Sequence, residues 1–336
     1  MSTSYAVRDG LTGPVQPVGS TAAADLHTIP QDLAAPAANA ATPASQTRVF
    51  AHRGASGLFP EHTRAAYMRA LAEGADGLEI DLHLTRDGEL VCFHDATLER
   101  TSDGAGSVSD VTLEHMRRLD IASWKTPQLP SEYGQKDQQL MTLQDVLELL
   151  ISAERDVGLA IELKHPSPYG HRLEDRALKI LLSYGWDPET SRIPSGQHSV
   201  EVSFMSFFSG SLLHLAEMVP AENLCALFTT VTEEAVDKRL GRRRFSTAVK
   251  PVVSAAMRRS VRDSKALVWK GQIGMAGPGV DYVHKHRDEA KAWLARGSRL
   301  RVWTVDADED LSMLLNLGVQ EITTNYPSKI LSRISA

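Results

Sequence analysis

The chain has 336 residues, of which 42% are hydrophobic, so it is long enough to bury a large core in one domain. Its formal net charge of −6 excludes the general basic field of a nucleic-acid-binding protein, so an anionic ligand would have to be held by a few local cations. Cys92 and Cys225 both lie in apolar runs, which predicts two reduced core cysteines and no disulfide framework.

The first 46 residues are rich in Ala, Thr, Pro and Ser and show no sustained helical or strand period. We expect a flexible tail over residues 1–46 and one barrel domain over residues 47–336. The chain starts without a basic segment followed by an apolar run, so it does not resemble a secretory signal, and no apolar run is long enough to span a bilayer. A cytoplasmic location is favoured, with unconventional export or a misassigned start codon as the alternatives.

Strand-like apolar runs alternate with helical patterns along the body of the chain. Residues 63–74 and 142–154 have helical amphipathic spacing, and Gly74 and Gly158 fall where helices should stop. The runs that read as strands are 48–52, 77–82, 89–93, 158–163, 200–205, 223–228, 299–305 and 320–324. Residues 279–284 form a ninth such run, so one of the nine is an extra element or not a strand. Eight strand–helix units predict a closed α/β barrel with its functional groups at the C-terminal ends of the strands.

Polar side chains gather where the first of these strands end. His52 closes the first run and His94 closes the third. Side chains of a strand alternate between two faces, so Glu79, Asp81 and His83 share one face of the second run. The first three strands therefore bring imidazoles and carboxylates to the same region.

Another acidic strand end follows at Glu162, and Lys164 has the same parity. A parallel barrel strand has no face in water, and like charges packed together repel unless a cation neutralises them. Oxygen ligands without a Cys–His cluster favour Mg²⁺ or Ca²⁺ over zinc. We predict that Glu79, Asp81 and Glu162 bind one such ion. The alternative is a buried ion pair between Glu162 and Lys164 without a metal.

The ordered set of motifs resembles the glycerophosphodiester phosphodiesterase family. The motifs are HRG at 52–54, PEHT at 60–63, EID at 79–81, FHD at 93–95, IELK at 161–164 and VWTVD at 302–306. The resemblance runs from about Arg48 to Ile334. It implies a TIM (β/α)8 barrel with a small insertion after the third strand, where residues 101–125 would shape substrate entry.

The resemblance also implies roles for single residues. His52 and His94 are the implied acid–base pair, with His52 placed as base and His94 as acid and the reverse left open. Glu79, Asp81 and Glu162 are again the ligands of one divalent metal. The implied substrate contacts are Arg53, Lys164, Trp303 and Glu61. Asn325 stands where the family commonly has Asp, and we expect this to affect the support of the last strand more than the chemistry.

The predicted function is metal-dependent hydrolysis of a small glycerophosphodiester to glycerol 3-phosphate and an alcohol. Phospholipase D-like hydrolysis of lysophospholipids on the same barrel is one alternative, and a non-catalytic barrel that binds phosphate esters is another. The basic run from Gly241 to Arg244, with Arg258, Arg259 and Arg262 beyond it, is interpreted as a solvated helical face. Peripheral contact with an anionic membrane is the alternative for that face.

Overall fold

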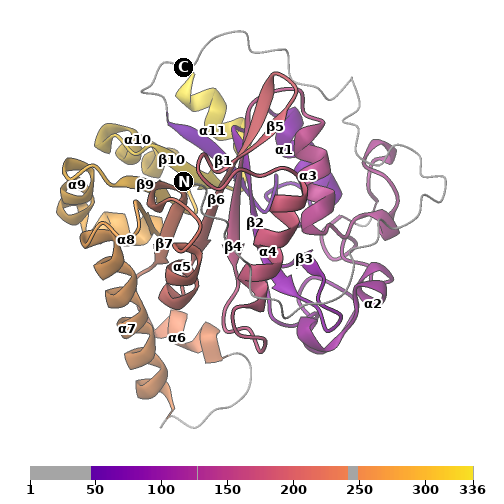
Figure 1. Ribbon diagram of the computed structural model, residues 1–336, viewed down its shortest axis with the longest axis horizontal. Coiled ribbons are helices and arrows are strands. Elements are labelled where there is room, and N and C mark those ends of the chain that lie inside the picture. The colour runs from indigo at the N-terminus through magenta and orange to yellow at the C-terminus, as the bar shows by residue number, and fades with distance from the viewer. Residues whose placement is uncertain (1–46, 127, 241–248, 336) are drawn as a thin grey trace, which may run out of the picture.

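The computed structural model describes residues 47–126, 128–240 and 249–335 (Figure 1). The predicted flexible tail over residues 1–46 and the basic run that starts at residue 241 lie outside this part of the chain. Within the described residues, none of the helices is both long and apolar enough to cross a lipid bilayer.

Eight parallel strands close into a barrel, as predicted. Each strand pairs with the next in parallel, and the last pairs with the first. In order around the barrel they are β1 (Arg48–His52), β2 (Gly77–Leu84), β4 (Val157–Leu163), β6 (His198–Ser206), β7 (Leu224–Phe228), β8 (Met275–Pro278), β9 (Arg299–Val302) and β10 (Glu321–Thr324). The C-terminal ends of these strands form one mouth, where side chains from distant parts of the chain meet.

The elements assigned from the sequence differ from the structure in four places. The run at 89–93 forms β3 (Leu90–Cys92), which pairs antiparallel with β2 outside the barrel. The run at 279–284 is mostly the helix α8 (Val280–Lys285), and Gly158 lies inside β4 instead of ending a helix. One barrel strand, β8, was missed because Met-Ala-Gly-Pro shows no alternation. A Cβ on Gly277 would lie 2.7 Å from Cys225 Sγ, so close packing against β7 defines this strand.

Helices cover the outside of the barrel, with α3 and α4 on one side and α7 to α9 on the other (Figure 1). The helices are α1 (Arg64–Ala72), α2 (Leu113–Arg117), α3 (Leu143–Ile151), α4 (Arg172–Ser183), α5 (Ser209–Leu215), α6 (Glu233–Leu240), α7 (Lys250–Trp269), α8, α9 (Arg287–Ala295), α10 (Asp308–Leu317) and α11 (Pro327–Ile334). Short 3-10 turns are η2 (Val108–Asp110), η3 (Ser131–Tyr133), η4 (Lys136–Gln138) and η5 (Ala221–Asn223), and β5 (Arg192–Ser195) pairs antiparallel with β6. Both predicted helices are present as α1 and α3, each capped by a threonine hydroxyl that accepts from a backbone N–H.

The barrel interior is a core of its own. It contains Phe50, Ala160, Met205, Cys225, Leu227 and Met275, with Trp303 packed against them. Phe50 lies so close to the neighbouring strands that a Cβ on Gly77 or Gly158 would be 2.5 or 2.6 Å from its ring. Both cysteines are free and buried, as predicted. The barrel interior below the mouth is therefore filled by side chains, and a ligand has to enter from the mouth.

The predicted insertion lies between β3 and α3 and has a separate small core. This core consists of Val91, Phe93, Leu98, Val108, Met116, Ile121 and Leu140. It holds the loop that carries Trp124 and Lys125 against the mouth of the barrel, where both side chains line a pocket. The insertion thus contributes part of the wall around the barrel mouth.

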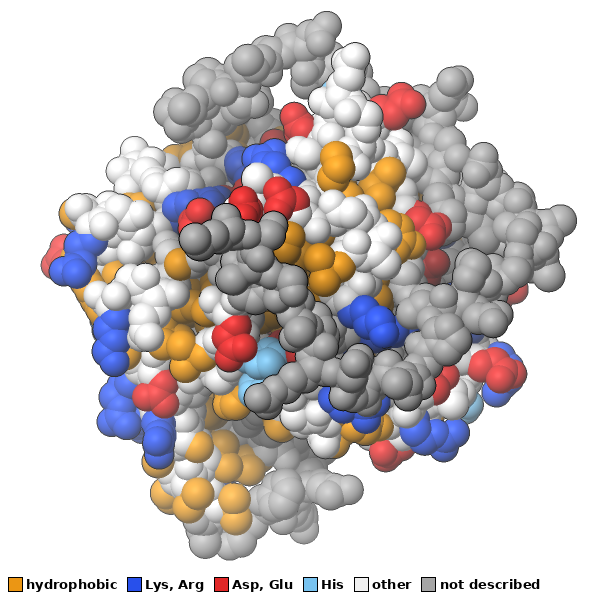
Figure 2. Space-filling view, in the orientation of Figure 1, with side chains coloured by type: hydrophobic (Ala, Val, Ile, Leu, Met, Phe, Trp, Pro, Cys, Tyr) orange, Lys and Arg blue, Asp and Glu red, His pale blue; other side chains and the backbone are white. Residues whose placement is uncertain are grey.

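The exposed face of α7 carries Arg258, Arg259 and Arg262, as expected for a solvated helical face. Val252, which is 67% exposed, lies near the start of the same helix. Figure 2 shows Lys and Arg side chains along α7 and hydrophobic side chains at its lower end. Arg259 is also 3.6 Å from Asp263, so part of this positive charge is balanced within the helix.

Candidate active site

Three buried carboxylates meet at the mouth of the barrel. Glu79 and Asp81 project from the same face of β2, and Asp81 is in register with Glu162 on the adjacent strand β4. One side-chain oxygen from each of the three lies within 4.8 Å of the other two. Their exposed fractions are 1%, 1% and 7%. Strand parity within β2 and parallel pairing with β4 together produce this cluster.

The cluster is electrostatically strained. Burial and the charge of Asp81 raise the pKa of Glu79 well above its ordinary value. Burial also raises the pKa of Glu162 to about 7. Burial alone would raise the pKa of Asp81 as well, but Lys164 and Arg53 outweigh it and hold that pKa well below the usual range. Protons or a bound cation must relieve the crowding of negative charge.

Two cationic side chains contact the carboxylates. Lys164 Nζ lies 2.9 Å from Asp81 Oδ1 and donates to Glu162 Oε1 at 2.7 Å. Arg53 Nε lies 3.1 Å from Asp81 Oδ2, and its Nη1 donates to Glu61 Oε1 at 2.8 Å. Arg53 adopts a left-handed φ of 58°, and its backbone N–H donates to Glu79 Oε2 at 3.0 Å. Such a backbone conformation disfavours most side chains and here aims the guanidinium at the acids.

The donor set fits a divalent cation. Two cations against three carboxylates leave one negative charge in excess, and all the candidate ligands are oxygens, which hard ions prefer. The ion pair between Glu162 and Lys164, the alternative to a metal site, is also present. However, one carboxylate oxygen each of Glu79, Asp81 and Glu162 still lies within 4.8 Å of the other two, close enough to bind one ion. The geometry therefore favours a metal site that includes the ion pair over an ion pair alone.

The two histidines lie near this cluster and have different partners. His52 ends β1, and its Nδ1 lies 2.8 Å from Asn325 Oδ1. His94 Nδ1 lies 2.5 Å from Asp95 Oδ1. Burial lowers the pKa of both imidazoles, to about 3 for His52 and about 4 for His94. One imidazole thus has a neutral amide as its partner and the other a carboxylate.

A chain of charges that the sequence reasoning missed connects these groups. Arg100 donates to Asp95 Oδ2 at 2.6 Å and to both oxygens of Glu61, at 2.9 and 2.6 Å. Glu61 in turn accepts from Arg53. Burial alone would raise the pKa of Glu61, but Arg100 and Arg53 outweigh it and lower that pKa. Arg100 lies in the insertion, where no motif marked it.

His62, in the PEHT motif, supports the acids from behind. Its Nε2 lies 2.8 Å from Asp81 Oδ2 and its Nδ1 2.7 Å from the Tyr67 hydroxyl, and the ring is 2% exposed. It therefore orients Asp81. The position of His62 within the PEHT motif was the signal available in the sequence.

Asn325 has a contact beyond the expected support of the last strand. Its Oδ1 contacts His52 Nδ1 and lies 2.7 Å from Ser56 Oγ, while the balance between support and chemistry stays a prediction. The residue follows β10 directly, and β10 is the neighbour of β1 in the closed barrel. Closure of the barrel brings Asn325 to the imidazole.

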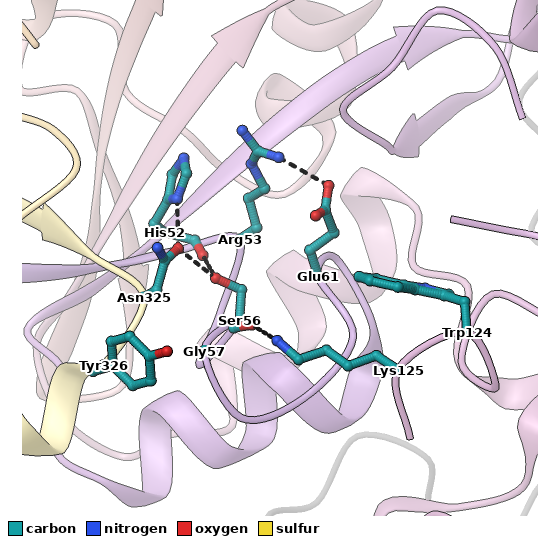
Figure 3. Close-up of a pocket in the computed structure, with 9 residues that line it drawn as sticks. All are labelled: His52, Arg53, Ser56, Gly57, Glu61, Trp124, Lys125, Asn325 and Tyr326. Atoms are coloured by element: carbon teal, nitrogen blue, oxygen red, sulfur yellow. Dashed lines mark hydrogen bonds and ion pairs between the residues drawn. The ribbon is translucent and has the colours of Figure 1, made fainter. Parts of the chain in front are cut away.

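A pocket of about 290 Å³ opens beside His52 and Arg53 (Figure 3). Its lining residues are His52, Arg53, Ser56, Gly57, Glu61, Trp124, Lys125, Asn325 and Tyr326. Trp303, a predicted substrate contact, is not among these lining residues. That ring is half-buried, donates from Nε1 to Gly277 O at 2.9 Å, and packs edge-on against Phe207 with a centroid distance of 5.5 Å. A contact of Trp303 with substrate stays a prediction.

Comparison with known proteins gives a consistent result. The glycerophosphoryl diester phosphodiesterase family matches residues 52–329. "Probable glycerophosphodiester phosphodiesterase 1" of Mycobacterium tuberculosis is 33% identical over 281 residues, which cover 84% of this chain and 90% of that protein. The glycerophosphodiester phosphodiesterase of Bacillus subtilis is 29% identical over 281 residues, covering 82% of this chain and 83% of that protein.

Solved structures share the fold. An Oleispira antarctica phosphodiesterase in complex with the product sn-glycerol-3-phosphate superposes with a TM-score of 0.63 at 22% identity, covering 87% of this chain and 98% of that one. A Thermotoga maritima glycerophosphodiester phosphodiesterase gives a TM-score of 0.56 at 17% identity, covering 85% and 97%. With the motifs, the barrel and these relatives together, the chain belongs to the glycerophosphoryl diester phosphodiesterase family, a family of phosphoric diester hydrolases.

Proposed function

We propose that this protein hydrolyses glycerophosphodiesters to glycerol 3-phosphate and an alcohol, with one divalent cation bound by Glu79, Asp81 and Glu162. The observation that carries the proposal is the convergence of these three buried carboxylates at the barrel mouth, near two imidazoles. Relatives named glycerophosphodiester phosphodiesterases, and a similar fold solved with sn-glycerol-3-phosphate, support the same substrate class.

The metal would be Mg²⁺ or Ca²⁺, and when bound it supplies Lewis-acid polarisation of a phosphate oxygen. Arg53 and Lys164 add fixed positive charge at the same place. Both are held by carboxylates, and contact with those acids keeps the pKa of each above its ordinary value although burial opposes it. They therefore stay charged and stabilise the negative charge that develops on the phosphate oxygens during P–O cleavage.

His52 is the proposed base. Burial, and next the charge of Arg53, lower the pKa of His52 to about 3, so the imidazole is neutral at pH 7 and can accept a proton from the attacking water. Its hydrogen bond to the amide oxygen of Asn325 acts in the opposite direction and favours the imidazolium that forms when the proton is accepted. A neutral resting imidazole is what proton abstraction requires.

His94 is the proposed acid that protonates the oxygen of the leaving alcohol. Its partner Asp95 is a carboxylate, which favours the imidazolium and raises the pKa that burial lowers. A phosphodiester bound nearby brings a further negative charge, which moves the pKa of His94 in the same direction. The oxygen of water forms the new P–O bond as the bond to the alcohol oxygen breaks, one proton of the water goes to His52, and the proton of His94 goes to the leaving oxygen. His52 then releases its proton to solvent and His94 takes one up, which balances the hydrolysis.

Lysophospholipids are a second candidate substrate class, and apolar side chains near the mouth favour it. Phe207 and Phe208 follow β6 and are 36% and 45% exposed, and Leu58 follows β1 and is 50% exposed. Trp124 of the insertion is 43% exposed at the pocket. An acyl chain could lie along such side chains while the phosphate occupies the same site.

A paired assay tests the proposal. Glycerophosphocholine and lysophosphatidylcholine are each incubated with the full chain, with Mg²⁺ or Ca²⁺ and with EDTA, and the released choline and phosphate ester are measured. We expect faster release from glycerophosphocholine, abolished by EDTA. Faster release from lysophosphatidylcholine would select the second class. A folded protein that cleaves neither ester with either metal would indicate a binding barrel and contradict the proposal.

A further inference from the structure

We propose that Asn325, oriented by Asp306, is a positioning residue that keeps the proton of His52 on Nδ1 and its lone pair on Nε2. The inference rests on the proposed function, in which that lone pair accepts the proton of the nucleophile. It assigns a role to Asp306, the last residue of the VWTVD motif, which the site described above leaves unused.

Asp306 determines which way the Asn325 amide points. Asp306 Oδ2 accepts from Asn325 Nδ2 at 2.6 Å, while its Oδ1 accepts from the backbone N–H of Asn325 at 2.9 Å and from Thr324 Oγ1 at 3.0 Å. An ionised carboxylate can only accept hydrogen bonds, so the NH₂ group of Asn325 must face it. The reverse orientation would bring the amide oxygen against the carboxylate. The Asn325 Oδ1 atom therefore faces away from Asp306.

The amide oxygen in turn determines the tautomer of His52. Asn325 Oδ1 lies 2.8 Å from His52 Nδ1, and Figure 3 shows the two side chains pointing at each other. A carbonyl oxygen has no proton to give, so Nδ1 has to be the protonated nitrogen. In a neutral imidazole the other nitrogen, Nε2, then carries the lone pair. The same amide oxygen of Asn325 also lies 2.7 Å from Ser56 Oγ, a hydroxyl that can donate a hydrogen bond to it.

The two histidines are thus prepared differently. The carboxylate of Asp95 contacts the His94 ring directly, whereas the carboxylate of Asp306 is one amide away from the His52 ring. Asp306 therefore imposes an orientation and a tautomer on His52 without placing a full negative charge against it.

A purely structural role for Asp306 is the competing explanation. Its bonds to Thr324 and to the backbone of Asn325 tie the loop after β9 to the end of β10. That role predicts a loss of stability when Asp306 is changed, but no change in the position of the His52 proton. The tautomer separates the two explanations.

The test records two-bond ¹H–¹⁵N correlations of ¹⁵N-histidine in the full chain without substrate, with the His52 signal assigned by its loss in His52→Gln. We expect wild-type His52 to carry its proton on Nδ1. In Asp306→Asn the oxygen of the introduced amide keeps accepting from Thr324 and the backbone, so its NH₂ group faces the Asn325 side chain and favours the reversed orientation of that amide. We therefore expect the proton of His52 to move to Nε2 and kcat to fall about 100-fold with KM little changed. Ser56→Ala, which removes the other contact of the same oxygen, is the matched control and should keep the Nδ1 tautomer.

The exchanged pair Asp306→Asn/Asn325→Asp provides the rescue. The amide introduced at position 306 would keep accepting from Thr324 and the backbone through its oxygen while donating from its NH₂ group to the carboxylate introduced at position 325. That carboxylate accepts from His52 Nδ1, so we expect the Nδ1 tautomer to return and kcat to recover at least tenfold over Asp306→Asn. Asn325→Asp alone opposes two carboxylates and should lose both stability and kcat.

A wild-type proton on Nε2, or an Asp306→Asn protein with an unchanged tautomer and kcat, would overturn the inference. A double variant that folds, by its circular dichroism, but does not recover the tautomer would also overturn it. These outcomes are read from the imidazole itself. If the wild-type chain cleaves no phosphodiester, the proposed function fails while the tautomer can still be scored.

Discussion

The two ends of the barrel interior both bury charged side chains, but at the N-terminal end the fully buried charges, Glu321 and Arg301, pair one to one. There Glu321, 1% exposed, accepts from Arg301 Nε at 2.7 Å, pairs with Arg299, and lies 3.6 Å from Arg48. At the C-terminal end, three carboxylates face two cations and the pKa of Glu79 is driven upward. Buried charge that is satisfied by partners supports the fold, whereas buried charge in excess marks a place where something binds.

The N-terminal cluster is closely fitted to its surroundings. Arg301 also donates to Ser203 Oγ at 3.0 Å, and its guanidinium lies 4.4 Å from the centroid of the Phe50 ring. Burial alone would raise the pKa of Glu321, but Arg301, Arg299 and Arg48 outweigh it and lower that pKa. The comparison predicts activity defects from changes at the mouth and stability defects from changes at the opposite end.

The largest expected effect is that of metal removal at the mouth. Exhaustive chelation should reduce phosphodiesterase activity to background, and Mg²⁺ or Ca²⁺ should restore it, because the excess negative charge of the acids needs a cation. Turnover is measured before chelation, after it and after re-addition of the metal. Activity that persists after complete stripping would support the metal-free ion pair instead.

Loss of either imidazole should rank next. His52→Ala and His94→Ala should each lower kcat by about 10²–10⁴-fold, the usual contribution of a positioned proton donor or acceptor. Binding of the metal should remain, because neither side chain is among its proposed ligands, and a thermal shift on adding Mg²⁺ checks this. A fully active double variant would refute the acid–base assignment.

Two isosteric variants, one at each end of the barrel interior, compare how much each buried carboxylate contributes to stability. Glu321→Gln should lower the free energy of unfolding by about 3–5 kcal/mol, because it leaves buried guanidinium groups unpaired. Glu79→Gln should change the unfolding free energy of the metal-free protein by less than about 1 kcal/mol, because it removes a repelled charge and keeps an acceptor for the Arg53 N–H. Urea unfolding of both proteins measures the difference. Equal losses from the two variants would show that the ends are not distinct.

The pH dependence of stability should sharpen the same contrast. The pKa of Glu321 in the folded protein is below its ordinary value of 4.5, so its contribution is fully present above that value and is lost as the pH falls through the lowered pKa. The gap in unfolding free energy between wild type and Glu321→Gln should be constant at about pH 5–7 and narrow in more acid solution. If the difference in unfolding free energy between the two proteins does not narrow in acid solution, ionisation of Glu321 is not its source.

The smallest effect is expected from removal of the tail. Deleting residues 1–44 should leave both kcat and the free energy of unfolding almost unchanged, because the barrel and the site residues lie within the remaining chain. Activity and urea unfolding of the shortened protein are compared with those of the full chain. A large loss of either would show that the tail packs onto the barrel.

Features that depend on short stretches of sequence were predictable. The shared face of Glu79 and Asp81 follows from strand parity, and the helices α1 and α3 follow from apolar spacing and their threonine caps. The barrel itself followed from the count of alternating units and from the family motifs. Predictions failed where local pattern and tertiary role diverge, as in β8, which has no alternation, and in α8, whose apolar residues imitate a strand.

The sequence by itself determined the fold class, the family and the residue types of the mouth, because these are written in periodicities and motifs a few residues long. Only the tertiary structure decided how the groups are paired. Asn325 reaches His52 across 273 positions, and Arg100 reaches Glu61 across 39. Such contacts depend on closure of the barrel and on the fold of the insertion, and no local pattern of residues encodes them.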